Sequence, residues 1–101
     1  MSMSGKERAA LRAEAHHLDV QVHVGHQGLT PALVQSLDDV LRTHMLVKVQ
    51  VAKAGTLSSK DAAHQIAEEL GAEVIQVIGR TCTLYRENPE LLRLKSPPWR
   101  K

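Results

Sequence analysis

Short stretches of apolar residues, bounded by polar residues and glycines, predict four strands. They span about residues 20–24, 45–52, 73–78 and 81–86. In the second stretch Lys48 lies between Val47 and Val49, which is the alternation of a strand with one face in the core. Only Gly79-Arg80 separates the last two stretches, so we expect them to form a tight hairpin.

Three longer stretches repeat apolar residues every three or four positions and predict helices, at about residues 5–17, 31–43 and 59–70. Thr30 is suited to cap the second helix, and Pro31 to occupy its first turn. Ser58 is expected to cap the third helix, with Asp61 completing a weak capping box. Gly71 is expected to end that helix. Residues 53–56 between the second strand and the third helix are expected to form a loop.

The predicted order is therefore α-β-α-β-α-β-β. Strands joined through a helix should run parallel, through right-handed crossovers, whereas a two-residue turn makes the last strand antiparallel to the third. We expect an α/β fold in the form of a two-layer sandwich, with helices packed on a four-stranded mixed sheet.

The composition fits one small domain with an aliphatic core. The chain has 101 residues, of which 43% are hydrophobic but only 2% aromatic, with no phenylalanine. Few aromatics argue against stacking platforms of the RRM type, and Tyr85 is more simply placed at the edge of the core. The single cysteine, Cys82, allows no disulfide within the chain and is expected to be an inert core residue. We place the domain at residues 1–88 and expect a basic, flexible tail at 89–101.

Charge is distributed unevenly, although the net charge is only +2. Residues 55–79 carry one lysine and four carboxylates, whereas residues 80–101 carry six cations and two carboxylates. The asymmetry permits a phosphate-facing side and an acidic side, while a merely solvated basic tail is the alternative. Apolar runs are too short to span a membrane, and the first residues lack the apolar stretch of a signal peptide. We therefore expect a cytoplasmic protein, and a monomer.

A glycine-bracketed turn follows the first strand and is the leading candidate for a binding site. Gly25 and Gly28 flank two polar residues, and Thr30 then begins a helix. Glycines let the backbone approach a phosphate closely, and a helix start adds partial positive charge. A strand-to-helix turn without any ligand is the alternative.

Several segments in this order resemble the CRM domain (chloroplast RNA splicing and ribosome maturation), and particularly its small stand-alone bacterial YhbY-like members. The resemblance covers roughly residues 6–87. It is carried by residues 11–18, the run Val24-Gly25-His26-Gln27-Gly28-Leu29-Thr30, residues 46–49 and 69–72, and residues 77–81 leading to Leu84-Tyr85-Arg86.

The resemblance implies a fold similar to the C-terminal domain of translation initiation factor 3, and it implies RNA binding. Stand-alone bacterial members associate with precursors of the large ribosomal subunit, and plant relatives act in group II intron splicing. The family's G-x-x-G loop is compared with the loop with which KH domains clamp an RNA backbone. Its positions here are Gly25, His26, Gln27 and Gly28. Ribosomal RNA in precursors of the large subunit is therefore the expected partner.

Cations near such a loop would complete an RNA-binding face. The candidates are Arg8 and Arg12 on the first helix, Lys48 on the second strand and Arg80 in the hairpin, together with Thr30 beside the loop. For each basic residue taken alone, an ordinary solvated surface position is the alternative.

Other classes of function have weaker support. His16, His17, His23 and His26 are close in sequence, but no carboxylate or cysteine completes a familiar ligand spacing, so we expect neither a metal nor another cofactor. No nucleophile motif or carboxylate pair points to an enzyme. A protein-interaction module that uses the acidic third helix is the alternative to RNA binding.

Overall fold

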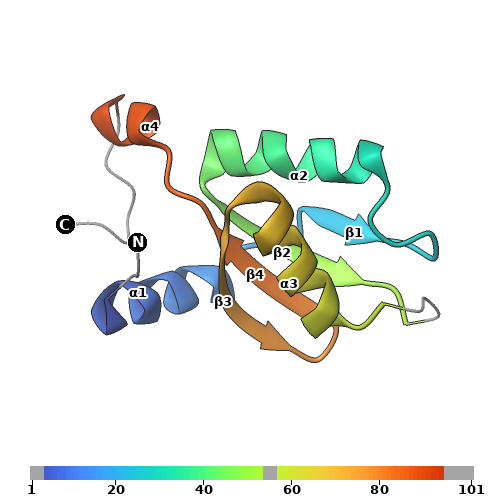
Figure 1. Ribbon diagram of the computed structural model, residues 1–101. Coiled ribbons are helices and arrows are strands. Elements are labelled where there is room, and N and C mark those ends of the chain that lie inside the picture. Colours follow the sequence, from blue (N-terminus) through green and yellow to red (C-terminus); the bar gives the residue numbers. More distant parts are fainter. Residues whose placement is uncertain (1–3, 54–56, 95–101) are drawn as a thin grey trace.

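The computed structural model describes residues 4–53 and 57–94, and its elements follow the predicted order (Figure 1). They are α1 (Gly5–His16), β1 (Val22–Val24), α2 (Pro31–His44), β2 (Leu46–Val51), α3 (Ser59–Leu70), β3 (Glu73–Ile78), β4 (Thr81–Tyr85) and α4 (Pro89–Leu94). The predicted α/β fold with a four-stranded mixed sheet is confirmed. Part of the expected loop, residues 54–56, and part of the expected tail, residues 95–101, lie outside the described residues.

The short helix α4 differs from the expectation of a flexible tail that starts at residue 89. Its six residues begin at Pro89, a residue type suited to a first helical turn. Leu91 packs against a small apolar cluster formed by α1 and the sheet. This contact with distant parts of the chain accounts for a helix that is too short to be stable by local propensity.

The strand order in the sheet is β1-β2-β4-β3. β1 runs parallel to β2, as predicted for strands joined by a helix, with Val22 opposite Val49. β4 is antiparallel to β3, as predicted from the tight turn, and it is also antiparallel to β2. β4 therefore inserts between β2 and β3, and leaves β1 and β3 as the two edges.

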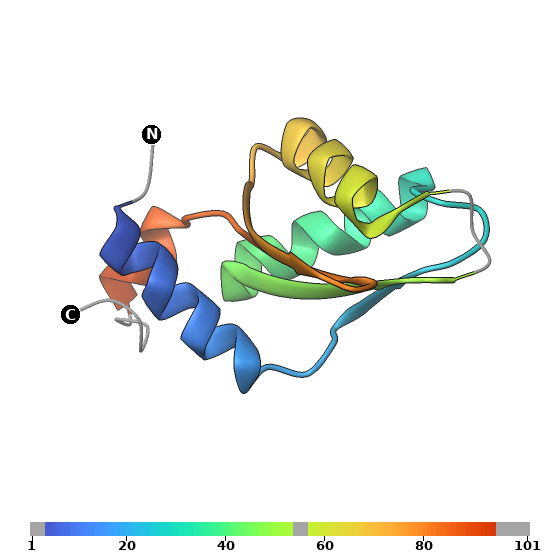
Figure 2. The same cartoon turned by 90° about the horizontal axis from the view of Figure 1, so that it is seen from below.

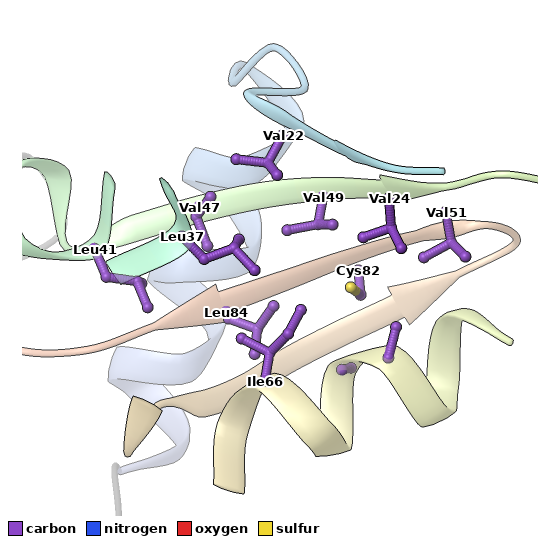
Figure 3. Packing of buried hydrophobic residues seen from close by; sticks show 12 residues of the cluster. Val22, Val24, Leu37, Leu41, Val47, Val49, Val51, Ile66, Cys82 and Leu84 are labelled. Atoms are coloured by element: carbon purple, nitrogen blue, oxygen red, sulfur yellow. The ribbon is translucent and has the colours of Figure 1, made fainter. Parts of the chain in front are cut away.

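Helices α2 and α3 cover one face of the sheet (Figure 2). The main core lies between these two helices and the sheet, and it is almost entirely aliphatic (Figure 3). Its buried members are Val22, Val24, Leu37, Leu41, Val47, Val49, Val51, Ala62, Ala63, Ile66, Cys82 and Leu84. Because strand side chains alternate between faces, the residues between these valines point to the opposite face.

Helix α1 lies on that opposite face and covers only one end of it (Figure 2). A second cluster forms there from Leu11, Met45, Leu46, Ile75 and Tyr85. Tyr85 is 6% exposed, which confirms its predicted place in the core. The rest of this face, beyond the end of α1, is not covered by another helix of the described chain, and we call it the open face.

The predicted helix boundaries are confirmed by their caps. The side chains of Thr30 and Ser58 each accept a hydrogen bond from the backbone N–H three residues later, at Leu33 and Asp61. Gly71 ends α3 with φ of 67°, a left-handed conformation that favours glycine. These local interactions explain why the sequence pattern located the helices well.

Candidate nucleic-acid interface

The Gly25–Gly28 segment forms a closed turn at the end of β1. The N–H of Gly28 donates to the carbonyl of Gly25 at 3.1 Å, and the N–H of Thr30 donates to the carbonyl of Gly28 at 3.2 Å. Gly28 has φ of 72°, so this position needs glycine for its backbone conformation. Gly25 has no such positive φ, and a side chain added there would meet no atom of the described residues within 4 Å. The space beside Gly25 is therefore open to a ligand.

Backbone donors of this turn are available for an anion. Within the described residues, the N–H groups of His26, Gln27 and Leu29 have no hydrogen-bond acceptor. His26 and Gln27 are exposed, and the positive end of α2 follows directly. Successive free N–H groups next to a helix start are an arrangement that binds phosphate or carboxylate.

The hairpin turn that carries Arg80 lies toward the same end of the molecule. The N–H of Ala52 donates to the carbonyl of Val24 at 2.8 Å, and the N–H of Val51 donates to the carbonyl of Arg80 at 2.7 Å. The end of β2 thus contacts both the residue before the glycine turn and the hairpin. Arg80 is exposed, and its guanidinium has no hydrogen-bond or ion-pair partner among the described residues.

Two further cations, which were not among the residues predicted to bind RNA, lie at this end. Lys53 is exposed directly after β2. Lys60 is exposed in the first turn of α3, where the hydroxyl of neighbouring Ser59 donates to the carbonyl of Gly79 at 2.6 Å. Asp61 is exposed in the same turn, so one carboxylate shares the region. We call residues 25–30 with Lys53, Lys60 and Arg80 the loop end. Lys53 and Lys60 belong to the loop end only because of the sheet topology. Nothing in their local sequence identifies them as candidates.

Arg8 is not near the loop end. Its guanidinium forms a salt bridge with Glu73 at 2.8 Å and donates to the carbonyl of Val74, also at 2.8 Å. These contacts hold α1 against the first residues of the edge strand β3. Arg8 therefore has a structural role that the sequence did not reveal.

Lys48 is also engaged within the protein. Its ammonium nitrogen donates to the carbonyls of Ala15 and Leu18, at 3.1 and 3.2 Å, and so caps the last turn of α1. Two of its three N–H donors are used in this way. The third is available at the open face of the sheet.

Arg12 remains an exposed cation with no partner among the described residues, but it lies on α1, away from the glycine turn (Figures 1 and 2). The structure thus brings together residues 25–28, Thr30 and Arg80. It places Arg12 and Lys48 on or beside the face that α1 partly covers, and Arg8 farther away at the start of β3.

The described chain gives little support for a metal site, a membrane-spanning helix or a reactive thiol. Residues 4–53 and 57–94 contain no group of three His, Cys, Asp or Glu side chains placed to hold a metal ion. None of the helices described is long and apolar enough to cross a membrane. Cys82 is buried in the main core, and this burial raises the pKa of its thiol from 9.0 to about 11, which disfavours the nucleophilic thiolate.

Comparison with known proteins identifies relatives over most of the chain. A family model described as the CRS1 / YhbY (CRM) domain matches residues 3–86. A protein of Haemophilus influenzae named "RNA-binding protein" is 34% identical over 88% of this chain and 90% of its own length. The "Probable RNA-binding protein MJ0652" of Methanocaldococcus jannaschii is 37% identical over 83% of this chain, which spans 63% of that relative.

A solved structure has the same fold. It is the solution structure of a hypothetical Staphylococcus aureus protein, described with that structure as an RNA-binding candidate. The two chains are 31% identical, with a TM-score of 0.65, over 86% of this chain and 91% of the other. Sequence and fold therefore agree, and the chain belongs to the CRS1 / YhbY (CRM) domain family.

Proposed function

We propose that this protein is a non-catalytic, cytoplasmic RNA-binding protein whose loop end contacts the phosphate backbone of ribosomal RNA. The observation that carries the proposal is the glycine turn, with three N–H groups that have no acceptor among residues 4–53 and 57–94, and with open space beside Gly25. Arg80, Lys53 and Lys60 add positive charge toward the same end. Relatives named as RNA-binding proteins support the same partner.

The chemistry of the loop end favours backbone contact over base stacking. Free N–H groups and lysine or arginine side chains match phosphate oxygens, which carry no sequence information. Tyr85 is buried in the second cluster, so it offers no stacking surface. Recognition at the loop end should therefore depend on the shape of a folded RNA.

We further propose that the bound RNA belongs to precursors of the large ribosomal subunit. The resemblance to stand-alone bacterial YhbY-like proteins supports this role. A net charge of only +2 also suits an assembly factor, because local positive charge on a nearly neutral protein allows binding to a preferred surface followed by release.

Gly25 offers a sharp test of the loop contact. Gly25→Val places a side chain in open space without a strained φ, so the fold should persist while RNA binding weakens about tenfold or more. Gly5→Val is the matched control, because Gly5 is equally open but begins α1, away from the turn. Both variants would be titrated with a structured ribosomal RNA fragment by fluorescence anisotropy. Equal affinities in the two variants would show that the turn does not touch RNA.

Gly28→Val, by contrast, would confuse two effects. Its φ of 72° makes any side chain there strained, so a loss of binding could reflect a loss of the turn itself. Gly25 is therefore the informative position of the pair.

The assembly role is tested separately, in cells. On a sucrose gradient, the protein should co-sediment with immature large subunits and be scarce on translating ribosomes. Cells lacking it should accumulate large-subunit precursors, most visibly under cold stress. An even distribution over mature ribosomes would refute the assembly role and leave RNA binding in place.

A further inference from the structure

The open face of the sheet contains a cavity that the proposed phosphate contacts do not use. Its volume is about 170 Å³, and it lies where α1 ends. The described residues that line it are His16, Lys48, Gln76, Ile78, Thr81 and Thr83. Thr83 pairs with Lys48 on one side and Gln76 on the other, so these three residues form a row across the sheet.

Thr83 at this cavity is a buried polar side chain that has no partner in the described part of the chain. It is only 1% exposed, and within the described residues its hydroxyl makes no hydrogen bond. Native proteins rarely leave such a group unsatisfied, because burying an unpaired hydroxyl is unfavourable by about 1–3 kcal/mol. A group that enters the cavity and bonds to Thr83 would remove this penalty.

Ile78 forms an apolar wall of the cavity, and its side chain is largely exposed. It is 59% exposed and is one of two large hydrophobic side chains exposed in the described part of the chain. The cavity thus combines an uncovered apolar surface with hydroxyl and amide groups. Among the residues that the structure describes, its lining includes Lys48 and His16, which can carry positive charge, and no carboxylate.

The volume of the cavity and the chemistry of its lining together limit which ligand can occupy it. The 170 Å³ is several times the roughly 30 Å³ of a single water. It is below the roughly 300–1,000 Å³ of pockets for drug-sized ligands. A nucleobase is a small planar heterocycle with apolar faces and hydrogen-bonding edges, and it is attached to a phosphate that cations attract.

We propose that this cavity receives one unpaired base of the bound RNA. The base packs against Ile78, its edge bonds to Thr83 and Gln76, and the adjoining phosphate lies near Lys48 and His16. The proposal rests on the proposed RNA-binding function and extends it, because it adds a base-specific contact to recognition of the backbone.

The isoleucines make a direct experiment possible. The chain has three, Ile66, Ile75 and Ile78, so a protein labelled only at the isoleucine δ1 methyl groups should give three NMR signals. Ile66 and Ile75 are 1% and 4% exposed and serve as internal controls. The probe is an RNA hairpin with an unpaired loop, compared with the same hairpin lacking the loop bases but keeping every phosphate.

We expect the intact hairpin to shift the Ile78 signal and the abasic hairpin to leave it unchanged. Thr83→Val removes the hydroxyl at constant shape and should weaken binding of the intact hairpin about three- to tenfold, the effect of one hydrogen bond. Its affinity for the abasic hairpin should stay the same. Thr83→Ser keeps the hydroxyl and should bind the intact hairpin like the parent.

The outcomes separate the two proposals. If the intact hairpin binds but Ile78 does not move, or if Thr83→Val binds it as tightly as the parent, the cavity takes no base and the backbone contact stands. If neither hairpin binds at all, and neither does structured ribosomal RNA, both proposals fail. A thermal melt of Thr83→Val should show a midpoint at or above that of the parent, because the variant loses an unpaired buried group.

Discussion

The ammonium nitrogen of Lys48, on β2, lies 3.1 Å from the carbonyl oxygen of Ala15, in the last turn of α1. It also bonds to the carbonyl of Leu18 at 3.2 Å. Carbonyls at a helix C-terminus lack intrahelical partners and carry partial negative charge, so a cation there stabilises the helix. Lys48 thus fixes the end of α1 on the sheet and shapes one wall of the cavity.

Replacing Lys48 should therefore lower stability. Lys48→Met keeps the aliphatic stem but removes both hydrogen bonds, and we expect the free energy of unfolding to fall by about 1–3 kcal/mol. Urea unfolding measures this change. Lys60→Met is the control, because Lys60 is exposed and makes no hydrogen bond or ion pair within the described chain. Equal midpoints for the two variants would mean that the cap contributes nothing.

The salt dependence of RNA affinity should identify the cations that meet phosphate. Each neutralised phosphate releases counterions, so Arg80→Gln should reduce the slope of log affinity against log salt by about one. Arg42→Gln is the control, because Arg42 on α2 already pairs with Asp38 and Asp39. A slope that Arg80→Gln leaves unchanged would remove Arg80 from the interface.

Arg12→Gln tests the other α1 arginine predicted to bind RNA, in the same titration. Arg8 is unsuitable for this purpose, because its contacts with Glu73 and Val74 make any substitution a test of stability as well.

Arg86 should prove important for stability and not for RNA binding. Its guanidinium bonds to the carboxylate of Asp38 at 2.8 Å and to the carbonyls of Leu70 and Asp38 at 3.0 and 3.2 Å. It thereby joins the segment after β4 to α2 and to the end of α3. Arg86→Met should lower the free energy of unfolding by about 2–3 kcal/mol, because charge-assisted hydrogen bonds are lost.

A double-mutant cycle with Asp38→Asn checks the source of that loss. The two changes should be less than additive, since either one removes the same ion pair. Full additivity would show that the two residues act independently. The salt slope of RNA binding should not change in Arg86→Met.

Cys82 provides a prediction about pH. Well below pH 9 the thiol is protonated in both states, so it does not affect the pH dependence of stability there. Between pH 9 and its folded-state pKa of about 11, the unfolded chain loses the proton first, so stability falls as pH rises. The loss should be at most about 2–3 kcal/mol, at 1.36 kcal/mol for each pKa unit.

Cys82→Ala provides the control for this experiment. Unfolding measured from pH 8 to 11 should decline less steeply in the variant, because other groups titrate equally in both proteins. The native parent should also resist iodoacetamide at pH 8 and react after denaturation. Rapid alkylation of the native protein would show that Cys82 is accessible.

The sequence by itself determined helices α1 to α3 and the four strands. Their signals are local: Thr30 and Ser58 accept bonds from N–H groups three residues later, and Gly71 adopts a conformation that favours glycine. Periodicity likewise depends only on which face of an element is buried. The glycine turn was visible for the same reason, since Gly25, Gly28 and the start of α2 are neighbours in the chain.

Only the tertiary structure decided the strand order and the partners of the candidate cations. A parallel crossover does not say which strand lies beside which, so the insertion of β4 between β2 and β3 had no local signal. In their local sequence, Arg8 and Lys48 cannot be told from solvated cations. In the fold, both donate hydrogen bonds to backbone carbonyls more than 25 residues away in sequence. Helix α4 and the cavity beside Thr83 depend on similar long-range contacts, because packing joins residues that the pattern along the chain keeps apart.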